Sequence, residues 1–259
     1  SGLSRRPAWH FEPESARHLL LRQFEVMNLD AYGCENLEAP VAAAGALLQY
    51  VKEMQQSALP HIQGMRLERR EDIIILDAAT RRNLELDFHP TGRVELTLFG
   101  VLDRTITAMG GRLLRRWLHQ PLRNQDVLKA RYDTIDQLRD ARLDGPVRTL
   151  LRRIGDIERI VSRIAVGSAR PRDLTTLRAA LECLPELDGL LASIEGPLAS
   201  NLKQKITPRA DMLSLIRSAV VDDPPSLIRD GGVIAPGYHP ELDELRLLSQ
   251  NHDQFLIEL

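Results

Sequence analysis

Aromatic residues and cysteines are scarce in this chain. Phenylalanine, tryptophan and tyrosine make up 4% of its 259 residues, which argues against a surface that stacks the bases of single-stranded nucleic acid. Cys34 and Cys183 are the only cysteines, lie far apart in the sequence and form no CxxC pair. Together with the lack of a secretory signal pattern, this predicts a cytoplasmic protein.

Motifs for phosphate and metal chemistry are also missing. Neither Gly110-Gly111 nor Gly231-Gly232 is followed by the lysine of a P-loop, GxxxxGK[ST], in which backbone N–H groups cradle phosphate. The sequence contains no GxGxxG, HExxH or GxSxG, and its histidines are scattered. We therefore predict that this chain is not an enzyme, and we assign it no catalytic, cofactor-binding or metal-ligating residue.

Neither the net charge nor the length of the apolar runs indicates binding to a polyanion or insertion into a bilayer. The formal net charge is -2, so a nucleic-acid binder of this composition would depend on a local basic patch. No apolar run is long enough to span a membrane, and we expect no membrane association. The hydrophobic fraction of 43% is sufficient to bury a sizeable core.

A central amphipathic helix is the clearest element that the sequence does contain. Thr107 is a suitable N-cap, and Pro121 ends the helix because it lacks an N–H and restricts the residue before it. The apolar positions recur at helical spacing, and we expect them, Trp117 included, to face a core: Met109, Leu113, Leu114, Trp117 and Leu118.

The first third of the chain predicts a small mixed segment. Trp9–Phe11 alternates as a short strand does, Pro13 opens a helix, and Pro40 starts a second helix that runs to about Gln56. The β-branched run Ile73–Ile75 favours a strand. Asp77–Leu86 then favours a helix capped by Asp77.

Helices dominate the sequence from Asn124 onward, with apolar stripes such as Ile157, Ile160, Val161 and Ile164. Ser226–Ile234 is typical of a β-hairpin around the Asp230-Gly231 turn. Pro240 opens a last helix without a visible stop. Its apolar stripe is expected to be exposed and to favour self-association: Leu242, Leu245, Leu248 and Phe255.

Two long strings carry a family resemblance. The first is Leu76–Leu86 (LDAATRRNLEL), and the second is Leu102–Leu118 (LDRTITAMGGRLLRRWL) with Pro121-Leu122 after it. Together they closely resemble the start of the core, or lever, domain of the MutS family of DNA mismatch repair proteins. The resemblance continues in order through Asp156–Arg159 (DIER), Ala169–Leu174 (ARPRDL), Asp230–Ile234 (DGGVI) and Glu241–Glu244 (ELDE).

The resemblance implies a mainly α fold in two parts. Residues 1–64 would be the C-terminal part of an α/β connector domain. Residues 65–259 would be the multihelical core, or lever, domain, truncated at the helix that leads to the clamp. The implied role is mechanical, because the lever couples the ATPase to the DNA clamp and has no catalytic site of its own.

The family also implies partners for the full-length protein. That protein recognises mispaired bases in duplex DNA, signals repair through ATP-dependent conformational change and MutL, and forms a homodimer. ATP and Mg²⁺ belong to a Walker-type domain, so we expect no cofactor in this chain. We likewise expect this chain alone to bind DNA weakly or not at all.

Two charged groups leave alternatives open. Arginines on helix faces could contact DNA. We favour instead that they pair with acids, including Asp156 and Glu158, or lie on a solvated helix face. These arginines are Arg112, Arg115, Arg116, Arg123, Arg148, Arg152, Arg153, Arg159 and Arg163. A second set, Asp77, Arg81, Arg82, Asp103 and Arg104, could form the active site of a small metabolic enzyme. We favour helix capping and a structural ion pair.

The whole chain also has a rival interpretation. A free-standing helical protein-interaction scaffold would show the same apolar stripes. Such a scaffold is expected to end in a capped helix, whereas no glycine, proline or cap residue follows Pro240.

Overall fold

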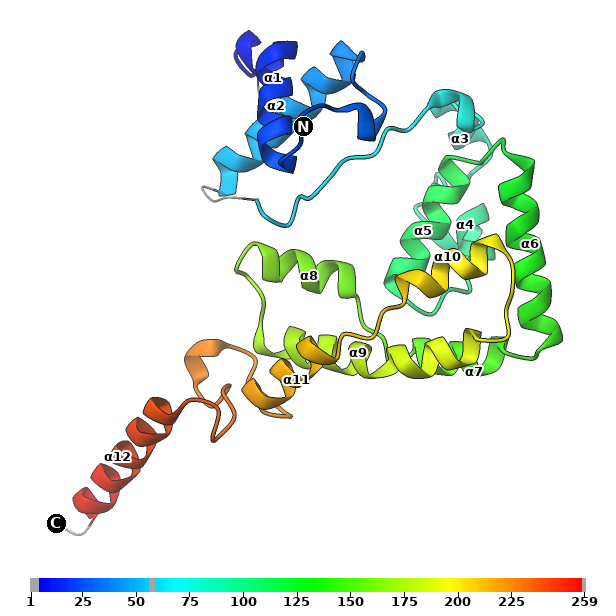
Figure 1. The fold of residues 1–259 in the computed structure, drawn as a ribbon. Helices are drawn as coiled ribbons and strands as arrows, with labels where there is room; N and C mark the ends of the chain where they lie inside the picture. The colour runs from blue at the N-terminus through cyan, green and yellow to red at the C-terminus, as the bar shows by residue number, and fades with distance from the viewer. Residues whose placement is uncertain (1–4, 56–58, 258–259) are drawn as a thin grey trace. The chain divides into compact units, whose positions relative to one another are not determined.

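The computed structural model describes residues 5–55 and 59–257, with residues 70 and 250–257 described by their backbone alone (Figure 1). Contacts divide the chain into two compact units. The first comprises residues 1–72 with 162–168, and the second comprises residues 73–161 with 169–259. The described residues form helices, short 3₁₀ turns and isolated β-bridges without a sheet, which confirms the mainly α fold.

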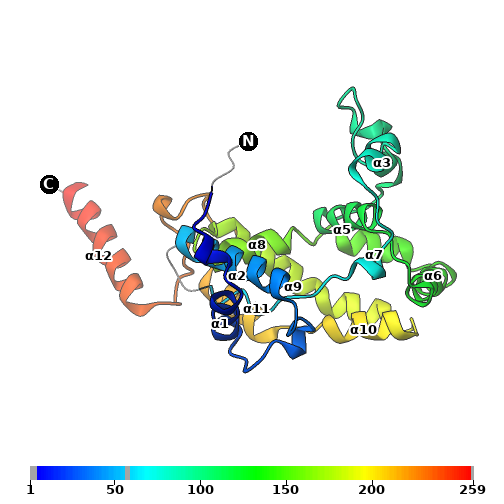
Figure 2. The same cartoon turned by 90° about the horizontal axis from the view of Figure 1, so that it is seen from above.

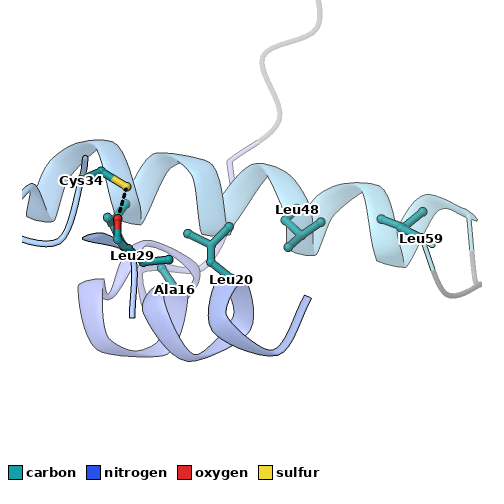
Figure 3. Close-up of a cluster of buried hydrophobic side chains, with 7 residues drawn as sticks. Ala16, Leu20, Leu29, Cys34, Leu48 and Leu59 are labelled. Carbon is teal, nitrogen blue, oxygen red and sulfur yellow. Dashed lines mark hydrogen bonds between the residues drawn. The ribbon is translucent and has the colours of Figure 1, made fainter. Parts of the chain in front are cut away.

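The first unit is built on two crossing helices, α1 (Pro13–Phe24) and α2 (Glu38–Gln55). They touch backbone to backbone, because a Cβ placed on Gly45 would lie 2.4 Å from the Cβ of Ala16. Figure 3 shows the buried cluster between these helices and their loops. Its members are Ala16, Leu20, Leu29, Cys34, Val41, Leu48 and Leu59.

The strand predicted at Trp9–Phe11 is wrong. Ala8–Phe11 forms a 3₁₀ turn, η1, in which the N–H of His10 donates to the carbonyl of Pro7 over 3.1 Å. A strand needs a neighbour to satisfy its backbone groups. The other elements of this unit are the short turns η2 (Asp30–Tyr32) and η3 (Arg70–Asp72), so its described residues offer no such neighbour.

The second unit begins with short elements that lead into the central helix. These are α3 (Ala78–Asn83), η4 (Val94–Leu96), α4 (Leu98–Leu102) and α5 (Ala108–His119). The strand expected at Ile73–Ile75 is reduced to a single bridge between Ile73 and Leu122, beside a bond from the N–H of Ile74 to the carbonyl of Pro121. Proline has no N–H, so it cannot extend the ladder.

The rest of the second unit is also helical. Its helices are α6 (Gln125–Asp140), α7 (Asp144–Leu151), α8 (Ile157–Ala165), whose first half belongs to this unit, α9 (Pro171–Leu191), α10 (Pro197–Lys205), α11 (Ala210–Ala219) and α12 (Pro240–Ile257). Helix α9 has 21 residues and contacts α7, α10 and α11 (Figure 2). At 1.5 Å per residue it is about 30 Å long.

Two buried clusters hold this assembly together. The first joins α7 to α9 through Leu150, Ile154, Ala180 and Cys183, with Met109 of α5 packed against it. The second joins α8, α9 and α11 through Ile160, Leu177, Ile216 and Val220. Both cysteines are buried.

The hairpin predicted at Ser226–Ile234 is wrong in its pairing. Ile234 forms its bridge with Val220, at the end of α11, while Ile228–Asp230 forms a 3₁₀ turn, η5. Burial accounts for the difference, because Val220 is 5% exposed in the second cluster, whereas Ile228 is 70% exposed. Ile234, which follows the two glycines, therefore pairs with the buried Val220.

Candidate functional site

The start of α5 is fixed by a compact turn. Thr107 caps the helix as predicted, since its Oγ1 accepts a hydrogen bond from the N–H of Gly110 over 3.1 Å. Asp103 Oδ1 accepts from both the N–H and the Oγ1 of Thr105, over 3.0 and 2.7 Å. A Cβ on Gly110 would lie 3.3 Å from the Cβ of Thr105. The first turn therefore has little room to shift.

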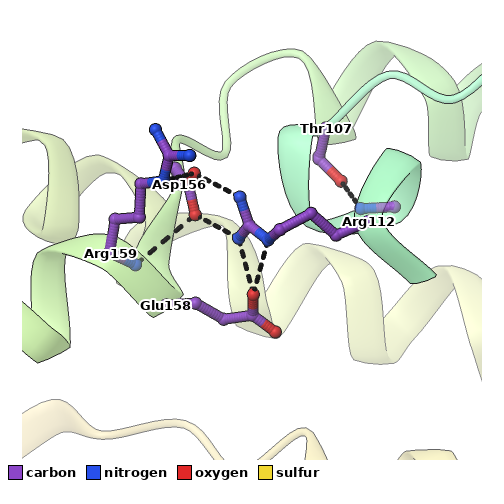
Figure 4. Close-up of polar contacts among 6 residues, drawn as sticks. Thr107, Arg112, Asp156, Glu158 and Arg159 are labelled. Atoms are coloured by element: carbon purple, nitrogen blue, oxygen red, sulfur yellow. Dashed lines mark hydrogen bonds and ion pairs between the residues drawn. The ribbon is translucent and has the colours of Figure 1, made fainter. Parts of the chain in front are cut away.

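Arg112 leaves α5 one turn later and joins it to the start of α8 (Figure 4). Its Nη1 and Nη2 donate to the two carboxylate oxygens of Asp156 over 2.8 and 2.6 Å. Its Nε also donates to Oε2 of Glu158 over 3.1 Å. A planar guanidinium supports such a fork, which a lysine cannot reproduce. We call Arg112, Asp156 and Glu158 the α5–α8 clamp.

The charges of the clamp are mutually stabilised. Hydrogen bonds from Arg112 lower the pKa of Asp156 below its usual value. Asp156 and Glu158 in turn raise the pKa of Arg112. The carboxylate of Asp156 also accepts from the N–H of Arg159 over 3.4 Å, at the first turn of α8, where negative charge is favourable. One aspartate therefore both caps α8 and binds α5.

Close packing lies directly beneath the clamp. A Cβ on Gly155 would lie 2.3 Å from Cγ2 of Thr176 in α9. The next apolar residue, Ile157, packs against both buried clusters. The clamp is therefore set on a tightly packed corner between α8 and α9.

The other end of α5 makes a second set of polar contacts. His119 Nε2 lies 3.0 Å from Oδ2 of Asp87, and Arg115 Nε lies 3.7 Å from the same oxygen. Arg81 of α3 approaches His119 Nδ1 to 3.4 Å. Sequence reasoning did not single out Asp87 or His119, because no local pattern links residues so far apart.

The prediction that Trp117 belongs to the core is wrong. Its side chain is 41% exposed, and the guanidinium carbon of Arg131 lies 3.8 Å from its ring centroid. Leu113, on the same helix, is 48% exposed. The helical spacing identified an apolar stripe correctly but could not show which element covers it.

Several of the basic residues have local partners. The pairing expected between helix arginines and acids is confirmed at Arg112 and Arg159, both of which contact Asp156. Arg153 pairs with Glu186 over 3.3 Å, and Arg148 donates to the carbonyl of Arg104 over 2.9 Å. These contacts support a structural role for this part of the basic surface.

The second charged set makes local contacts: Arg81 approaches His119, and Arg104 donates to the carbonyl of Asp103. Asp77 caps α3 as predicted, accepting from the N–H of Thr80 over 2.6 Å, and this bond lowers the pKa of Asp77. No ion pair joins Asp77 or Asp103 to an arginine within residues 5–55 and 59–257. The ion pair expected among these residues is therefore absent from the described residues, and the capping role remains.

The described parts of the chain contain neither a metal-ligand cluster nor a membrane-spanning helix. In them, no three side chains of histidine, cysteine, aspartate or glutamate gather as metal ligands would. None of the described helices combines the length and the apolar character that a membrane span requires.

Comparison with protein families gives two matches that together cover most of the chain. The family description "MutS domain III" matches residues 79–259, and "MutS domain II" matches residues 1–63. Apart from Leu76–Ala78, the strings that carry the sequence resemblance all lie within the first of these matches. The first match alone spans well over half of the residues.

Proposed function

Since this chain belongs to the MutS family of mismatch repair proteins, we propose that its second unit acts as a lever. The lever would carry an ATP-driven rearrangement of the whole protein to the part that grips mismatched duplex DNA. The chain itself would contribute no catalytic group. Its first unit would serve as the connector that passes signals to MutL, in a cytoplasmic homodimer.

The observation that carries this proposal is the α5–α8 clamp. A lever must move as one body, so its elements need contacts that resist separation. Arg112 joins α5 to α8 with a forked ion pair, and Ile157 fixes the same corner to both buried clusters. Polar geometry and apolar packing therefore restrain the same joint.

Nucleotide chemistry is assigned to another part of the whole protein. The glycine pairs of this chain lack the lysine of a P-loop. Gly110 packs against Thr105 and Thr107, so a phosphate cradle does not fit there. Neither glycine pair therefore fits the phosphate groups of ATP.

The first experiment is to sequence the gene on both sides of the segment that encodes this chain. Two motifs in the same reading frame would support the proposal. A downstream GxxxxGK[ST] would indicate an ATPase domain, and an upstream Phe-x-Glu would indicate the wedge with which the MutS family reads mispairs. The lever would then lie between the two. Start and stop codons directly flanking this sequence would refute the lever proposal and favour the free-standing helical scaffold.

The second experiment tests coupling in the longest open reading frame. Arg112→Gln removes the forked ion pair, and Arg152→Gln is the control, because Arg152 is an exposed arginine outside the clamp. We expect Arg112→Gln to retain mismatch binding and basal ATP hydrolysis but to slow ATP-induced release from DNA. If the Arg112→Gln protein folds and its release from DNA is as fast as before, the α5–α8 clamp has no mechanical role.

A further inference from the structure

A basic cavity lies beside α3 and the C-terminal end of α5, which are both coloured in the cyan-to-green range of Figure 1. Its volume is about 610 Å³. The lining residues are Ala78, Arg81, Arg82, Asp87, Phe88, Pro90 and His119. None of them belongs to the α5–α8 clamp, so the cavity is separate from the site proposed above.

The only carboxylate in this lining is already engaged. Asp87 faces His119 at 3.0 Å and Arg115 at 3.7 Å, both of which come from α5. Arginine can only donate, so the contact with Arg81 makes Nδ1 of His119 the acceptor. Nε2 of His119 lies close to Oδ2 of Asp87 without forming a hydrogen bond, and Arg115 is the permanent cation beside that carboxylate.

The two arginines of α3 therefore carry surplus positive charge. Arg82 is exposed and has no polar partner among residues 5–55 and 59–257. Arg81 uses one nitrogen on His119 and keeps its other donors. Guanidinium groups with free donors bind phosphate oxygens in paired hydrogen bonds. Asp77, which caps α3, offsets part of the charge of Arg81, so Arg82 carries most of the surplus.

The lining of the cavity also has apolar members. Phe88 is 54% exposed, and Pro90 lines the same cavity. An exposed aromatic ring next to free donors suits a ligand that joins an anionic group to a planar ring. The cavity volume leaves room for both parts.

We propose that this cavity binds a phosphate monoester carried on a flat ring. Arg81 and Arg82 hold the phosphate oxygens, Phe88 and Pro90 contact the ring, and Asp87 limits the affinity. The inference does not depend on the lever function, because it rests on the charge balance and the walls of the cavity alone.

The test is an NMR titration of the intact chain with inorganic phosphate and with phenyl phosphate, following arginine side-chain N–H signals at constant ionic strength. We expect saturable binding of phenyl phosphate, tighter than that of inorganic phosphate. Arg82→Gln should weaken both ligands by about tenfold or more, since hydrogen bonds to charged groups are the stronger class. Phe88→Ala should weaken phenyl phosphate alone, by about two- to fivefold.

The control is Arg152→Gln, which removes one exposed arginine outside the cavity. Its binding should equal that of the unchanged chain. A linear, non-saturating response, or an equal loss in Arg82→Gln and Arg152→Gln, would overturn the site. Equal affinity for the two ligands would overturn the ring contact and with it the proposed ligand class.

Discussion

The sharpest test of the packing beneath the clamp is Gly155→Ala. An added Cβ would lie 2.3 Å from Cγ2 of Thr176, whereas carbon atoms in contact normally stand about 3.5–4.0 Å apart. Thr176 is β-branched, and its Oγ1 donates to the carbonyl of Arg172 over 2.9 Å, so it resists rotation. Overpacking of this kind costs about 1–3 kcal/mol.

Two further variants separate this clash from other effects. Thr176→Ser removes Cγ2 but keeps the hydroxyl, so Gly155→Ala should cost almost nothing in that background. The coupling energy of the double-mutant cycle should then be about 1–3 kcal/mol. Gly189→Ala is the matched control, because no atom lies within 4 Å of its added Cβ. It should stabilise α9 by about 0.5–1 kcal/mol.

The assay is urea unfolding followed by tryptophan fluorescence. The chain has two tryptophans, of which Trp9 lies in the first unit and Trp117 in the second. A Trp9→Phe background therefore makes the signal report on the unit that contains Gly155. If Gly155→Ala costs the same free energy with threonine and with serine at position 176, the contact with Cγ2 is not the cause.

Three further predictions concern charge, capping and the last helix. The pKa of Asp156 is lowered below its usual value by the hydrogen bonds from Arg112, so its stabilising contribution is present above the usual carboxyl pKa and is lost as pH falls through the lowered pKa. Arg112→Gln should therefore flatten the loss of unfolding free energy below about pH 4. Asp77→Ala should lower the unfolding midpoint while Asp77→Ser largely preserves it, and equal midpoints would contradict the cap. Leu248 is 65% exposed, so Leu248→Glu should reduce self-association in light scattering, and a strict monomer before mutation would refute this.

Local signals in the sequence were sufficient to place several helix starts. Pro13 and Pro240 each occupy the first turn of a helix, and Thr107 and Asp77 each cap one. These signals work because a proline or a capping side chain acts within its own turn. The expected exposure of the last helix is confirmed at Leu245, which is 63% exposed, whereas the side chain of Phe255 lies outside the described residues.

Predictions that depended on a distant partner succeeded less often. Trp9–Phe11 alternates like a strand but forms a 3₁₀ turn, because alternation does not supply a pairing neighbour. The segment at Ile234 does pair, but with Val220 rather than with the residues just before the glycines. The boundary at residues 64 and 65 stays a prediction, since the first family match ends at 63 and the second begins at 79.

Helix α5 illustrates why the candidate site was only half visible in the sequence. Asp156 and Glu158 were among the acids expected to pair with the helix arginines. Asp87 follows no such pattern, yet it receives both Arg115 and His119 from the last turns of α5. The helix is thus bound by charge at two places along its 12 residues, to α8 near its start and to the loop after α3 near its end. A displacement of either partner must then move or break α5, which is the behaviour that a lever requires.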